Sequence, residues 1–218
     1  MISFHHAYKV FPNGHQGLKN VTFEIEKGEF VFLTGPSGAG KTTLFKLISG
    51  YDKPSSGFVE VLGNDVAHLR AIEVPYFRRR IGVIYQDFRL LNDRSVFENI
   101  AMPLVVRGEK GQTIARRVGE VLDQVGLASK HDSFPEELSG GEQQRVAIAR
   151  AIVHQPGVLI ADEPTGNLDH GMSNEIFRLL EHVNARGTTV FVATHDLEAI
   201  RKRPFRVIRI HEGQVVSA

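Results

Sequence analysis

The chain has 218 residues, of which 42% are hydrophobic, so it is long and apolar enough to bury the core of one domain. It contains no cysteine, which excludes disulfides and thiolate metal sites and suits a reducing compartment such as the cytoplasm. There are 26 Lys and Arg residues against 25 Asp and Glu residues, a net charge of +1, so no global basic field attracts nucleic acid or anionic lipid.

Neither a secretion signal nor a membrane span is expected. Residues 1–6 lack a charged region followed by an apolar stretch, and no apolar run approaches the roughly 20 residues that cross a bilayer. A role at a membrane would therefore need a partner protein. With the sequence ending at Ala218, we expect no appended regulatory domain.

Strands are expected at the two ends of the chain and before the first glycine-rich loop. Residues 4–11 and 206–216 predict antiparallel strands at the margin of a sheet, the second pair with a hairpin at 211–214. Residues 21–26 alternate apolar and polar side chains, and the apolar run 30–33 follows after a turn. This run predicts a strand that leads into the glycine-rich loop.

The first glycine-rich loop has the pattern G-x-x-x-x-G-K-[ST]. In this pattern backbone N–H groups surround phosphates, the lysine reaches the outer phosphates and the next hydroxyl binds Mg²⁺. We therefore predict that Lys41 contacts the β and γ phosphates of a nucleotide, that Thr42 binds magnesium and that Thr43 lies near the α phosphate. The alternative, a tight turn that happens to use glycine, leaves the lysine and the hydroxyl unexplained. The predicted phosphate-binding residues are Gly35, Pro36, Ser37, Gly38, Ala39, Gly40, Lys41, Thr42 and Thr43.

An α/β core is predicted around this loop. Residues 41–49 carry apolar side chains at helical spacing and stop at Gly50, which predicts a helix with a glycine C-cap. A mostly helical stretch from about residue 88 to residue 154 interrupts the core and is predicted to be a subdomain. Helical patterns separate three short apolar runs that are suited to buried parallel strands: residues 81–85, 158–161 and 189–193.

A second glycine-rich segment, residues 138–142, lies where a long helix is predicted to begin, and it has no lysine. Ser139 and Glu142 have the spacing of a capping box, which would start the helix. The glycines between them leave N–H groups and the positive end of the helix dipole open to a phosphate, so both interpretations can hold. Two anion sites and one phosphate-binding lysine predict that two chains share their nucleotides. The predicted binding residues here are Ser139, Gly140, Gly141 and Glu142.

Polar side chains follow three predicted strands at their carboxyl ends, where ligands of open α/β sheets bind. Asp162 is predicted to bind magnesium through water, and Glu163 to act as the general base that polarises an attacking water. The alternative is a solvated pair that caps the next loop. Gln86 is placed to contact magnesium or that water. His195 is placed to touch the γ phosphate, or else only precedes a helix capped by Asp196.

The other histidines and the short basic runs predict no site. His5 and His6 are neighbours in a predicted strand, so their side chains would point to opposite faces. The runs 78–80 and 201–203 are expected on a solvated surface, where they would attract lipid only weakly.

Taken together, these motifs resemble those of the ATP-binding subunits of ABC (ATP-binding cassette) systems, over nearly the whole chain. The resemblance implies a P-loop NTPase of the α/β class, with a RecA-like core, an antiparallel β margin and a helical subdomain. One domain would span residues 1–218, with the core at about 1–87 and 155–218 and the subdomain at about 88–154. The corresponding family motifs are a Walker A loop at 35–43, a Q-loop at Gln86, a signature motif at 138–142, a Walker B end at 162–163, a D-loop at 167–169 and a switch histidine at His195.

The resemblance also implies the chemistry. The chain would hydrolyse ATP to ADP and phosphate with Mg²⁺, as a head-to-tail homodimer in which each ATP lies between one chain's Walker A loop and the other chain's signature motif. Phe11 corresponds to the aromatic residue that stacks on adenine, with Tyr8 as the alternative. Glu142 stands where many members have glutamine, which brings a carboxylate near the phosphates and leaves the role of this position open.

Within the family, residues 86–94 and 162–169 resemble the ATPase of a bacterial cell-division complex, and relatives in lipoprotein release and macrolide efflux share the second passage. The finer resemblance implies an integral membrane partner, contact with the division machinery and a peripheral position on the cytoplasmic face of the inner membrane. ATP cycling would then control cell-wall hydrolases outside the membrane. Apolar residues after Gln86 are expected to form core in part, and in part a groove for a short helix of the partner: Phe88, Leu90, Leu91, Val96, Phe97 and Ile100.

Two other classes of function remain open. A soluble ABC ATPase that acts on nucleic acid would favour a basic groove or a long coiled-coil insertion, and the sequence has neither, so no nucleic-acid partner is expected. A nucleotide-gated scaffold would hydrolyse little ATP and work by binding partners. Steady turnover stimulated by a membrane partner would argue against such a scaffold.

Overall fold

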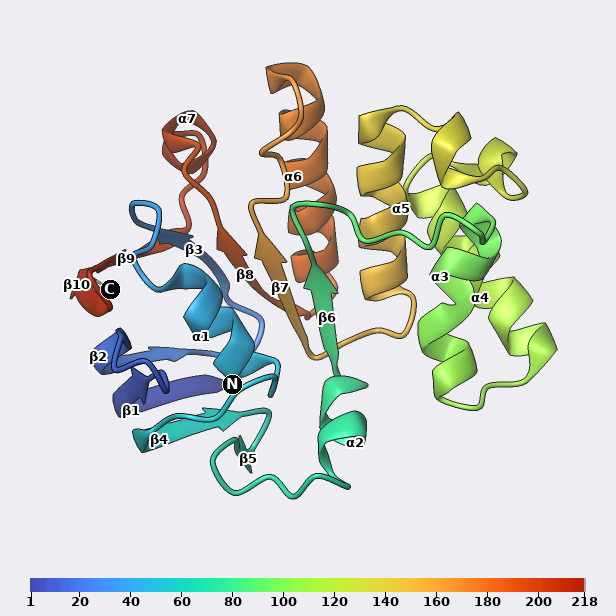
Figure 1. The fold of residues 1–218 in the computed structure, drawn as a ribbon. Helices are drawn as coiled ribbons and strands as arrows, with labels where there is room; N and C mark the ends of the chain where they lie inside the picture. The colour runs from blue at the N-terminus through green and yellow to red at the C-terminus, as the bar shows by residue number, and fades with distance from the viewer. Residues whose placement is uncertain (218) are drawn as a thin grey trace.

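A central sheet of six strands runs through the computed structural model, which describes residues 1–217 (Figure 1). The strands are β3 (Phe30–Thr34), β6 (Ile81–Ile84), β7 (Val158–Asp162), β8 (Thr189–Ala193), β9 (Arg206–His211) and β10 (Gln214–Ser217). Their order is β10-β9-β3-β8-β7-β6, and every pairing is parallel except that of β10 with β9. The apolar runs of β3, β7 and β8 are buried on both faces, which confirms the predicted parallel strands.

Alternate side chains of the central sheet enter two separate cores. Val31 packs in one core with helix α1 (Lys41–Ile48), whereas its neighbour Phe32 packs in the other with helices α5 (Gly140–Ile152) and α6 (His170–Ala185). This follows from the period of two in a strand, which sends successive side chains to opposite faces. Because helices cover both faces, the loops at the ends of the strands are left open to form a site.

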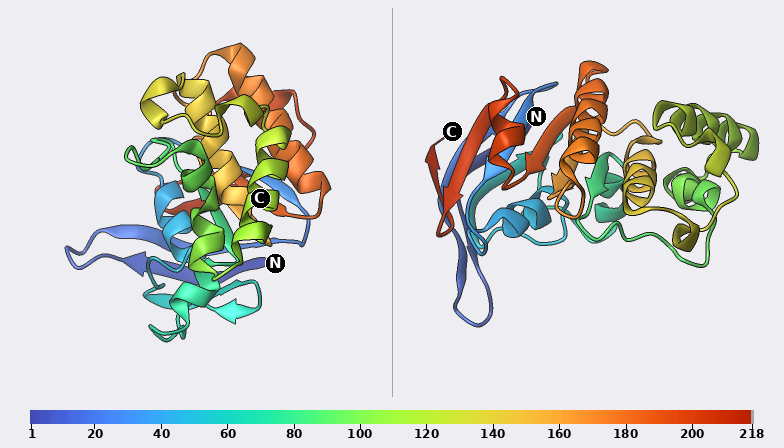
Figure 2. Two further views of the ribbon diagram at one scale, coloured as in Figure 1. Left: turned by 90° about the vertical axis from the view of Figure 1, so that its right-hand side faces the viewer. Right: turned by 90° about the horizontal axis from the view of Figure 1, so that it is seen from above.

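A second sheet is antiparallel and shares the core of α1. It consists of β1 (Ile2–Val10), β2 (Gln16–Ile25), β4 (Ser56–Val61) and β5 (Asn64–Asp65), in the order β2-β1-β4-β5. In the register of β1, Ile2 lies between Ile25 and Val61, and all three side chains are fully buried. Seen from above, these strands lie at the opposite end of the molecule from the helices that follow β6 (Figure 2).

The expectations for the chain ends need two corrections. Residues 4–11 do form an antiparallel strand, but it lies inside a sheet of its own rather than beside the parallel strands. β9 lies parallel to β3, and only β10 is antiparallel. Alternation shows that a strand has a buried face and does not show which strand it pairs with. The hairpin is confirmed, with φ of 47° at Glu212 and 79° at Gly213, as expected for a type I′ turn.

The segment between β6 and β7 is mostly helical. Helices α3 (Val96–Val106) and α4 (Gly111–Gln124) pack with α5 in one core. α3 begins at a capping box in which the Ser95 N–H donates to the Glu98 carboxylate at 2.9 Å. The other helices are α2 (Val74–Arg78), α7 (Leu197–Arg201) and two 3-10 turns, Ala128–Lys130 and Pro135–Glu137. Within residues 1–217, no helix has the length and apolar character needed to cross a bilayer.

The basic run 78–80 is more than a solvated surface. Arg78 is half-buried, its Nη2 donates to the carbonyl of Gly50 at 2.9 Å, and its guanidinium lies 3.9 Å from the centre of the Tyr51 ring. The expectation was therefore wrong for this residue, because a carbonyl left free at the end of α1 needs a donor.

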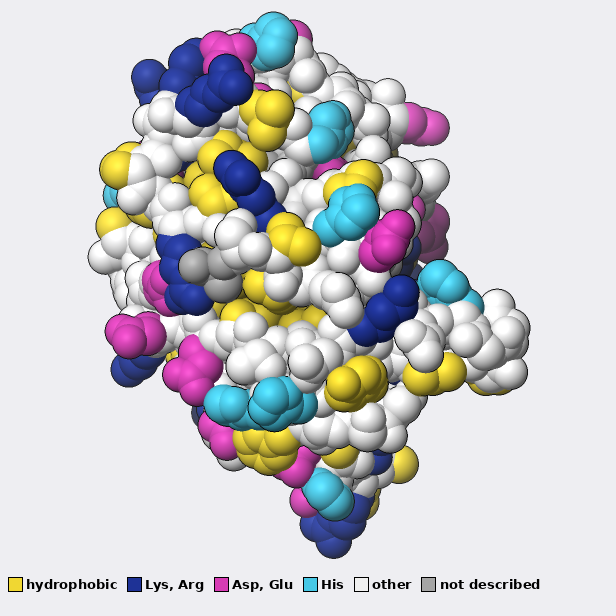
Figure 3. All heavy atoms as spheres, turned by 90° about the vertical axis from the view of Figure 1, so that its left-hand side faces the viewer, with side chains coloured by type: hydrophobic (Ala, Val, Ile, Leu, Met, Phe, Trp, Pro, Cys, Tyr) yellow, Lys and Arg dark blue, Asp and Glu magenta, His cyan; other side chains and the backbone are white. Residues whose placement is uncertain are grey.

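The second basic run lies at the end of α7. Lys202 forms an ion pair with Glu198 on the exposed surface. Arg203 forms one with Glu181, and its side chain is only 8% exposed because it also packs over the Phe177 ring, so the expectation of a solvated run was wrong for this residue. Figure 3 shows the face of the molecule that carries β10: Lys and Arg side chains gather near its top with acidic side chains beside them, and both signs are interspersed below. Charge on this face is therefore mixed.

Candidate nucleotide site

The carboxyl ends of four parallel strands, β3, β6, β7 and β8, meet at one edge of the central sheet. A cavity of about 540 Å³ opens there, as expected for an open α/β sheet. The structure therefore brings together residues that are up to 180 positions apart in the chain. The cavity is lined by His15, Gly17, Gly35, Pro36, Ser37, Gly38, Ala39, Gly40, Lys41, Thr42, Thr43, Gln86, Asp162, Glu163 and His195.

The phosphate loop, residues 35–43, delivers the N-terminus of α1 to this cavity. Gly40 precedes the helix with φ of 110°, and a Cβ atom there would lie 2.7 Å from the Gly17 carbonyl oxygen, so only glycine fits. No side chain caps α1. Its first backbone N–H groups and the positive end of its dipole therefore face the cavity, which makes an anion site.

Lys41 lies folded over the phosphate loop. Its Nζ donates to the carbonyl oxygen of Gly35 at 2.7 Å and to that of Pro36 at 3.2 Å. Among the ion pairs of residues 1–217, Lys41 has no carboxylate partner. Charged phosphate oxygens are stronger acceptors than these neutral carbonyls, so the ammonium is free to turn toward an anion in the cavity.

Thr42 and Asp162 connect the phosphate loop to the end of β7. The Thr42 hydroxyl donates to Asp162 Oδ2 at 3.4 Å. Burial raises the pKa of Asp162, and the neighbouring Glu163 carboxylate raises it further. A cation would relieve this charge, and Mg²⁺ typically binds one or two protein oxygens together with phosphates and water. Within the described residues no three His, Cys, Asp or Glu side chains form a metal cluster.

Glu163 is fixed at the wall of the cavity by the end of β8. Its N–H donates to the Ala193 carbonyl at 2.9 Å, and its Oε2 accepts from the His195 N–H at 3.2 Å and lies 2.8 Å from His195 Nδ1. The φ of Glu163 is 48°, in the left-handed region, which costs a residue with a side chain roughly 1–3 kcal/mol. The Glu163 side chain is 13% exposed, whereas that of His195 is 73% exposed. The imidazole thus lies at the open side of a fixed carboxylate.

Both interpretations of His195 describe the structure. Its ring lines the cavity beside Glu163. Asp196, the next residue, caps α7 by accepting from the Ala199 N–H at 2.9 Å. The cap fixes the backbone of this segment, and the ring remains free to meet a ligand.

Gln86 lies between the cavity and the loop after β7. Its carbonyl oxygen accepts from Asn167 Nδ2 at 3.2 Å, and a Cβ atom on Gly166 would lie 3.3 Å from its Nε2. The end of β6 is therefore connected to the segment that follows Glu163, although nothing in the sequence pairs them.

The segment 138–142 forms a capped helix N-terminus outside this cavity. Ser139 Oγ accepts from the Glu142 N–H at 3.3 Å, and the Ser139 N–H donates to the Glu142 carboxylate at 2.8 Å, which confirms the capping box. The hydrogen bond from the Ser139 backbone lowers the pKa of Glu142, and the Ser139 hydroxyl lowers it further. Lys130 lies 3.4 Å from the same carboxylate. Glu142 thus stays ionised, and its charge is partly offset by donors of its own chain.

Phe11 lies beside the cavity rather than in its wall. Its ring stacks on His15 at 6.1 Å between ring centres, and a Cβ atom on Gly17 would lie 2.6 Å from its Cε2. Tyr8 is 37% exposed on β1 and lines no part of the cavity. His15 and Gly17 were not predicted from the sequence, and they reach the cavity because the turn after β1 and the start of β2 lie against the phosphate loop.

A model of the ABC transporter family matches residues 18–166. The chain belongs to this family. The cell division ATP-binding protein FtsE of Escherichia coli (strain K12) is 51% identical over 99% of this chain and 97% of its own length. The protein of the same name from Bacillus subtilis (strain 168) is 50% identical over 99% of this chain and 95% of its own length.

Solved structures show the same fold. The dimeric post-hydrolysis state of the ATP-binding cassette MJ0796, bound to ADP and Pi, has a TM-score of 0.90 and 35% identity, and covers 100% of this chain and 97% of its own. The structure of cbiO1 from Clostridium perfringens has a TM-score of 0.91 and 31% identity, and the match covers 99% of this chain and 86% of the cbiO1 chain. The predicted fold class and ATPase activity are therefore confirmed for this ABC ATPase.

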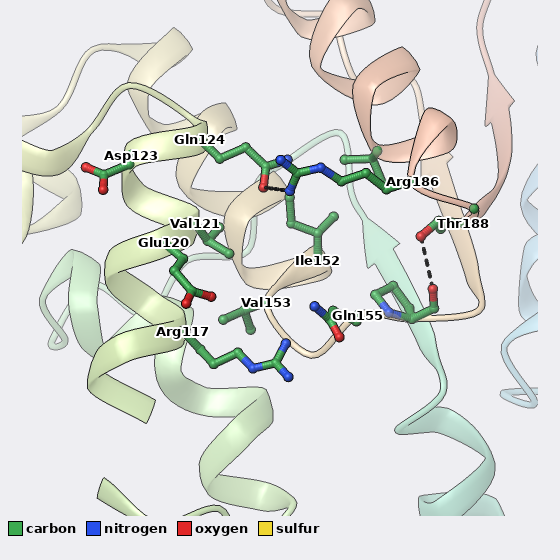
Figure 4. A pocket seen from close by; sticks show the side chains of 13 residues that line it. Arg117, Glu120, Val121, Asp123, Gln124, Ile152, Val153, Gln155, Arg186 and Thr188 are labelled. Atoms are coloured by element: carbon green, nitrogen blue, oxygen red, sulfur yellow. Dashed lines mark hydrogen bonds between the residues drawn. The ribbon is translucent and has the colours of Figure 1, made fainter. Parts of the chain in front are cut away.

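Larger pockets than the candidate site occur elsewhere on this ABC ATPase. A pocket of about 690 Å³ lies between α4, the end of α5 and the end of α6, near the amino ends of β7 and β8 (Figure 4). Its polar contacts are internal: Arg186 Nη1 donates to Gln124 Oε1 at 3.0 Å, and the Thr188 hydroxyl donates to the Pro156 carbonyl at 3.2 Å. The smaller cavity is the candidate site, because it holds the N-terminus of α1 and the fixed carboxylates.

Proposed function

We propose that this ABC ATPase binds ATP with Mg²⁺ in the cavity at the carboxyl ends of β3, β6, β7 and β8 and couples its hydrolysis to bacterial cell division. One observation carries the proposal: this cavity occurs in a chain about half identical, over its full length, to proteins named FtsE. In the proposal the protein is peripheral to the cytoplasmic face of the inner membrane, and its partner is the integral membrane protein FtsX.

The phosphate loop would hold the nucleotide. Its N–H groups and the N-terminus of α1 surround the phosphates, and Lys41 exchanges the Gly35 and Pro36 carbonyls for the β and γ phosphate oxygens. Thr43 lies near the α phosphate. Phe11, whose ring lies directly beside Gly17 of the cavity wall, stacks on the adenine.

Hydrolysis would use the carboxylates at the end of β7. Mg²⁺ would be held by Thr42, Asp162 and Gln86, and its charge offsets the negative charge of the phosphates. Glu163 accepts the proton of the attacking water, and its fixed position orients that water. His195 presents its exposed ring to the γ phosphate.

A second copy of the chain would complete each site. Ser139, Gly140, Gly141 and Glu142 carry an anion-binding helix end, yet none of them lines the cavity of their own chain. A head-to-tail homodimer places this end over the partner's γ phosphate and so explains both glycine-rich segments. The dimeric MJ0796 structures support this arrangement, since they have the same fold.

Contact with the membrane partner would use exposed apolar side chains of the loop before α3 and of the end of α3. Of the six apolar residues after Gln86, Val96 and Ile100 are fully buried and belong to the core, whereas Leu91 is 40% exposed. Val105 and Val106, at the end of α3, are 57% and 54% exposed. An apolar face of this kind suits a short helix of the partner.

The test is capture of the partner in the ATP-bound state. Glu163→Gln carrying an affinity tag is expressed, membranes are solubilised with ATP and Mg²⁺, and co-purifying proteins are identified by mass spectrometry. Glu175→Gln, which removes an exposed carboxylate of α6 outside the cavity, is the matched control. FtsX recovered with Glu163→Gln supports the proposal. A lipoprotein-release or efflux permease would move the chain to that branch, and no membrane protein at all would refute the membrane role.

Purified Glu163→Gln tests the catalytic assignment separately. It is expected to retain ATP and to elute as a dimer when ATP and Mg²⁺ are present, because the nucleotide contacts remain and the base is lost. Hydrolysis at the rate of the parent protein would remove Glu163 from the role of general base.

A further inference from the structure

The loop after Gln86 has a strained backbone. Phe88 and Arg89 have φ of 55° and 50°, in the left-handed region that residues with side chains rarely adopt. The Arg89 N–H donates to the Asp87 carbonyl at 2.5 Å, which closes a three-residue turn around Phe88. A turn of this kind with a positive φ at its centre is rare and strained. It persists only where the surrounding structure holds it.

A single side chain holds this turn. Arg150 of α5 donates from Nη2 to the Phe88 carbonyl at 2.6 Å and from Nη1 to the Arg89 carbonyl at 2.6 Å. Within residues 1–217 these are the only hydrogen bonds of the Arg150 side chain, and no carboxylate pairs with it. A cation in a half-buried position is costly unless its donors are used. The planar guanidinium therefore needs the two carbonyls of the turn as acceptors, and the turn needs the guanidinium to hold it in place.

The other contacts of the turn are weaker. Arg89 lies 3.9 Å from the centre of the Tyr85 ring and 3.1 Å from Asp87, but both charged side chains are more than half exposed. Exposed pairs of this kind contribute little. The Phe88 N–H also donates to the Tyr85 carbonyl, but at 3.3 Å this bond is long. Release of the Arg150 contacts would therefore leave only the backbone bonds of the turn and these exposed contacts to hold Phe88 and Arg89 in the left-handed region.

Arg150 links two parts of the nucleotide machinery. Figure 1 shows the segment after β6 crossing α5 on its way to α3. At 1.5 Å per residue, Arg150 lies about 15 Å along α5 from the helix end that carries Ser139 and Gly140. At the other side of the turn, Gln86 lines the nucleotide cavity. Helix α5 thus connects the helix end at Ser139 and Gly140 with the loop that follows Gln86.

We propose that Arg150 is a positioning residue that ties the loop after Gln86 to the signature helix α5 by holding Phe88 and Arg89 in the strained turn. The inference rests on the proposed function, because the N-terminus of α5 serves the nucleotide of the partner chain. When α5 moves onto that nucleotide, Arg150 carries the turn with it and shifts Gln86 in its own site. The state of one site thereby reaches the other.

The test compares Arg150→Met in two matched backgrounds, one with Phe88→Ala and Arg89→Ala and one with Phe88→Gly and Arg89→Gly. Both backgrounds lack the Phe88 and Arg89 side chains, but only glycine occupies the left-handed region without strain. If Arg150 acts by holding the turn, the loss caused by Arg150→Met is large with alanine and small with glycine. If Arg150 acts only by packing, the loss is equal in the two backgrounds. Should Arg150→Met fail to fold, Arg150→Lys replaces it in both backgrounds, because lysine keeps the charge but lacks the planar guanidinium.

Two readouts are needed. Amide hydrogen exchange of residues 86–92 without nucleotide is expected to rise about tenfold with Arg150→Met in the alanine background and less than threefold in the glycine background. ATPase kcat is expected to fall about tenfold, equivalent to about 1.4 kcal/mol, in the alanine background and less than threefold in the glycine background. KM and the nucleotide Kd stay within about twofold in both, because the phosphate loop is untouched.

The outcomes separate this inference from the proposed function. Equal losses in the two backgrounds, or an unchanged exchange rate, would overturn the role of Arg150. Faster exchange with unchanged kcat would show that Arg150 holds the turn, and it would overturn the proposed coupling between the two nucleotide sites. Turnover by the parent protein and ATP-dependent dimerisation of Glu163→Gln report the proposed function independently. If those fail, the proposed function is wrong, and the exchange comparison still decides whether Arg150 holds the turn.

Discussion

His154 is expected to make this protein less stable in acid. The residue follows α5, is 8% exposed, and neither of its ring nitrogens has a hydrogen-bond partner within residues 1–217. Burial lowers its pKa from 6.5 to about 4, and the nearby Arg107, which donates to the His154 carbonyl at 2.7 Å, contributes to the shift. The ring is therefore neutral in the folded state through most of the range in which an exposed histidine is charged.

The size of the effect follows from the two pKa values. The unfolded chain binds a proton near pH 6.5 and the folded chain only near pH 4, so stability is fully present above pH 6.5 and is lost as the pH falls from 6.5 to 4. A difference of 6.5 − 4, about 2.5 units, corresponds to about 3 kcal/mol at most. At about pH 5 the loss is about 2 kcal/mol. This is a large part of a typical folding free energy of about 5–15 kcal/mol.

Urea unfolding at about pH 7.5 and about pH 5 measures this loss. His154→Met fills a similar volume and cannot titrate, so it is expected to lose about 2 kcal/mol less than the parent protein between the two pH values. His68→Met, which replaces a side chain that is 85% exposed, is the control and should lose as much as the parent. An equal loss for the parent and His154→Met would refute the argument, because the buried ring would then not be the group that resists protonation.

Four further outcomes follow from the site and the core. Lys41→Ala is expected to weaken ATP binding at least about tenfold in equilibrium titration, since it removes a charged donor to the phosphates. Ser139→Ala removes the cap of α5 and is expected to cost about 1 kcal/mol in urea unfolding, with Ser139→Asp retaining most of that stability. Gly141→Ala places a methyl group on Met172 Cε and is expected to lower the free energy of unfolding by about 1–3 kcal/mol. In thermal unfolding, the double variant with Met172→Ala should lose less stability than the sum of the losses of the two single variants. Leu91→Glu is expected to abolish recovery of the membrane partner with an unchanged unfolding temperature, and full recovery would exclude the face around Leu91.

The sequence by itself determined the local parts of the site. The phosphate loop and the start of α1 could be predicted because Gly40 and Lys41 belong to the pattern G-x-x-x-x-G-K-[ST]. In the structure Gly40 takes the left-handed conformation directly before the helix. The capping box at Ser139 and the hairpin at Gly213 are equally local, since each depends on residues within four positions of one another. The apolar run of β7 also predicted that Asp162 and Glu163 lie at the end of a buried strand.

Contacts between distant segments were decided only by the tertiary structure. Alternating side chains predicted strands at both chain ends, but not that β1 lies in a second sheet or that β9 is parallel to β3. The pair Glu163 and His195 forms because β7 and β8 are neighbours, which strand patterns do not reveal. His15 and Gly17 line the cavity because the start of β2 lies against the phosphate loop. Neighbouring residues set dihedral angles and caps, whereas pairing between strands depends on packing that no short segment of the chain contains.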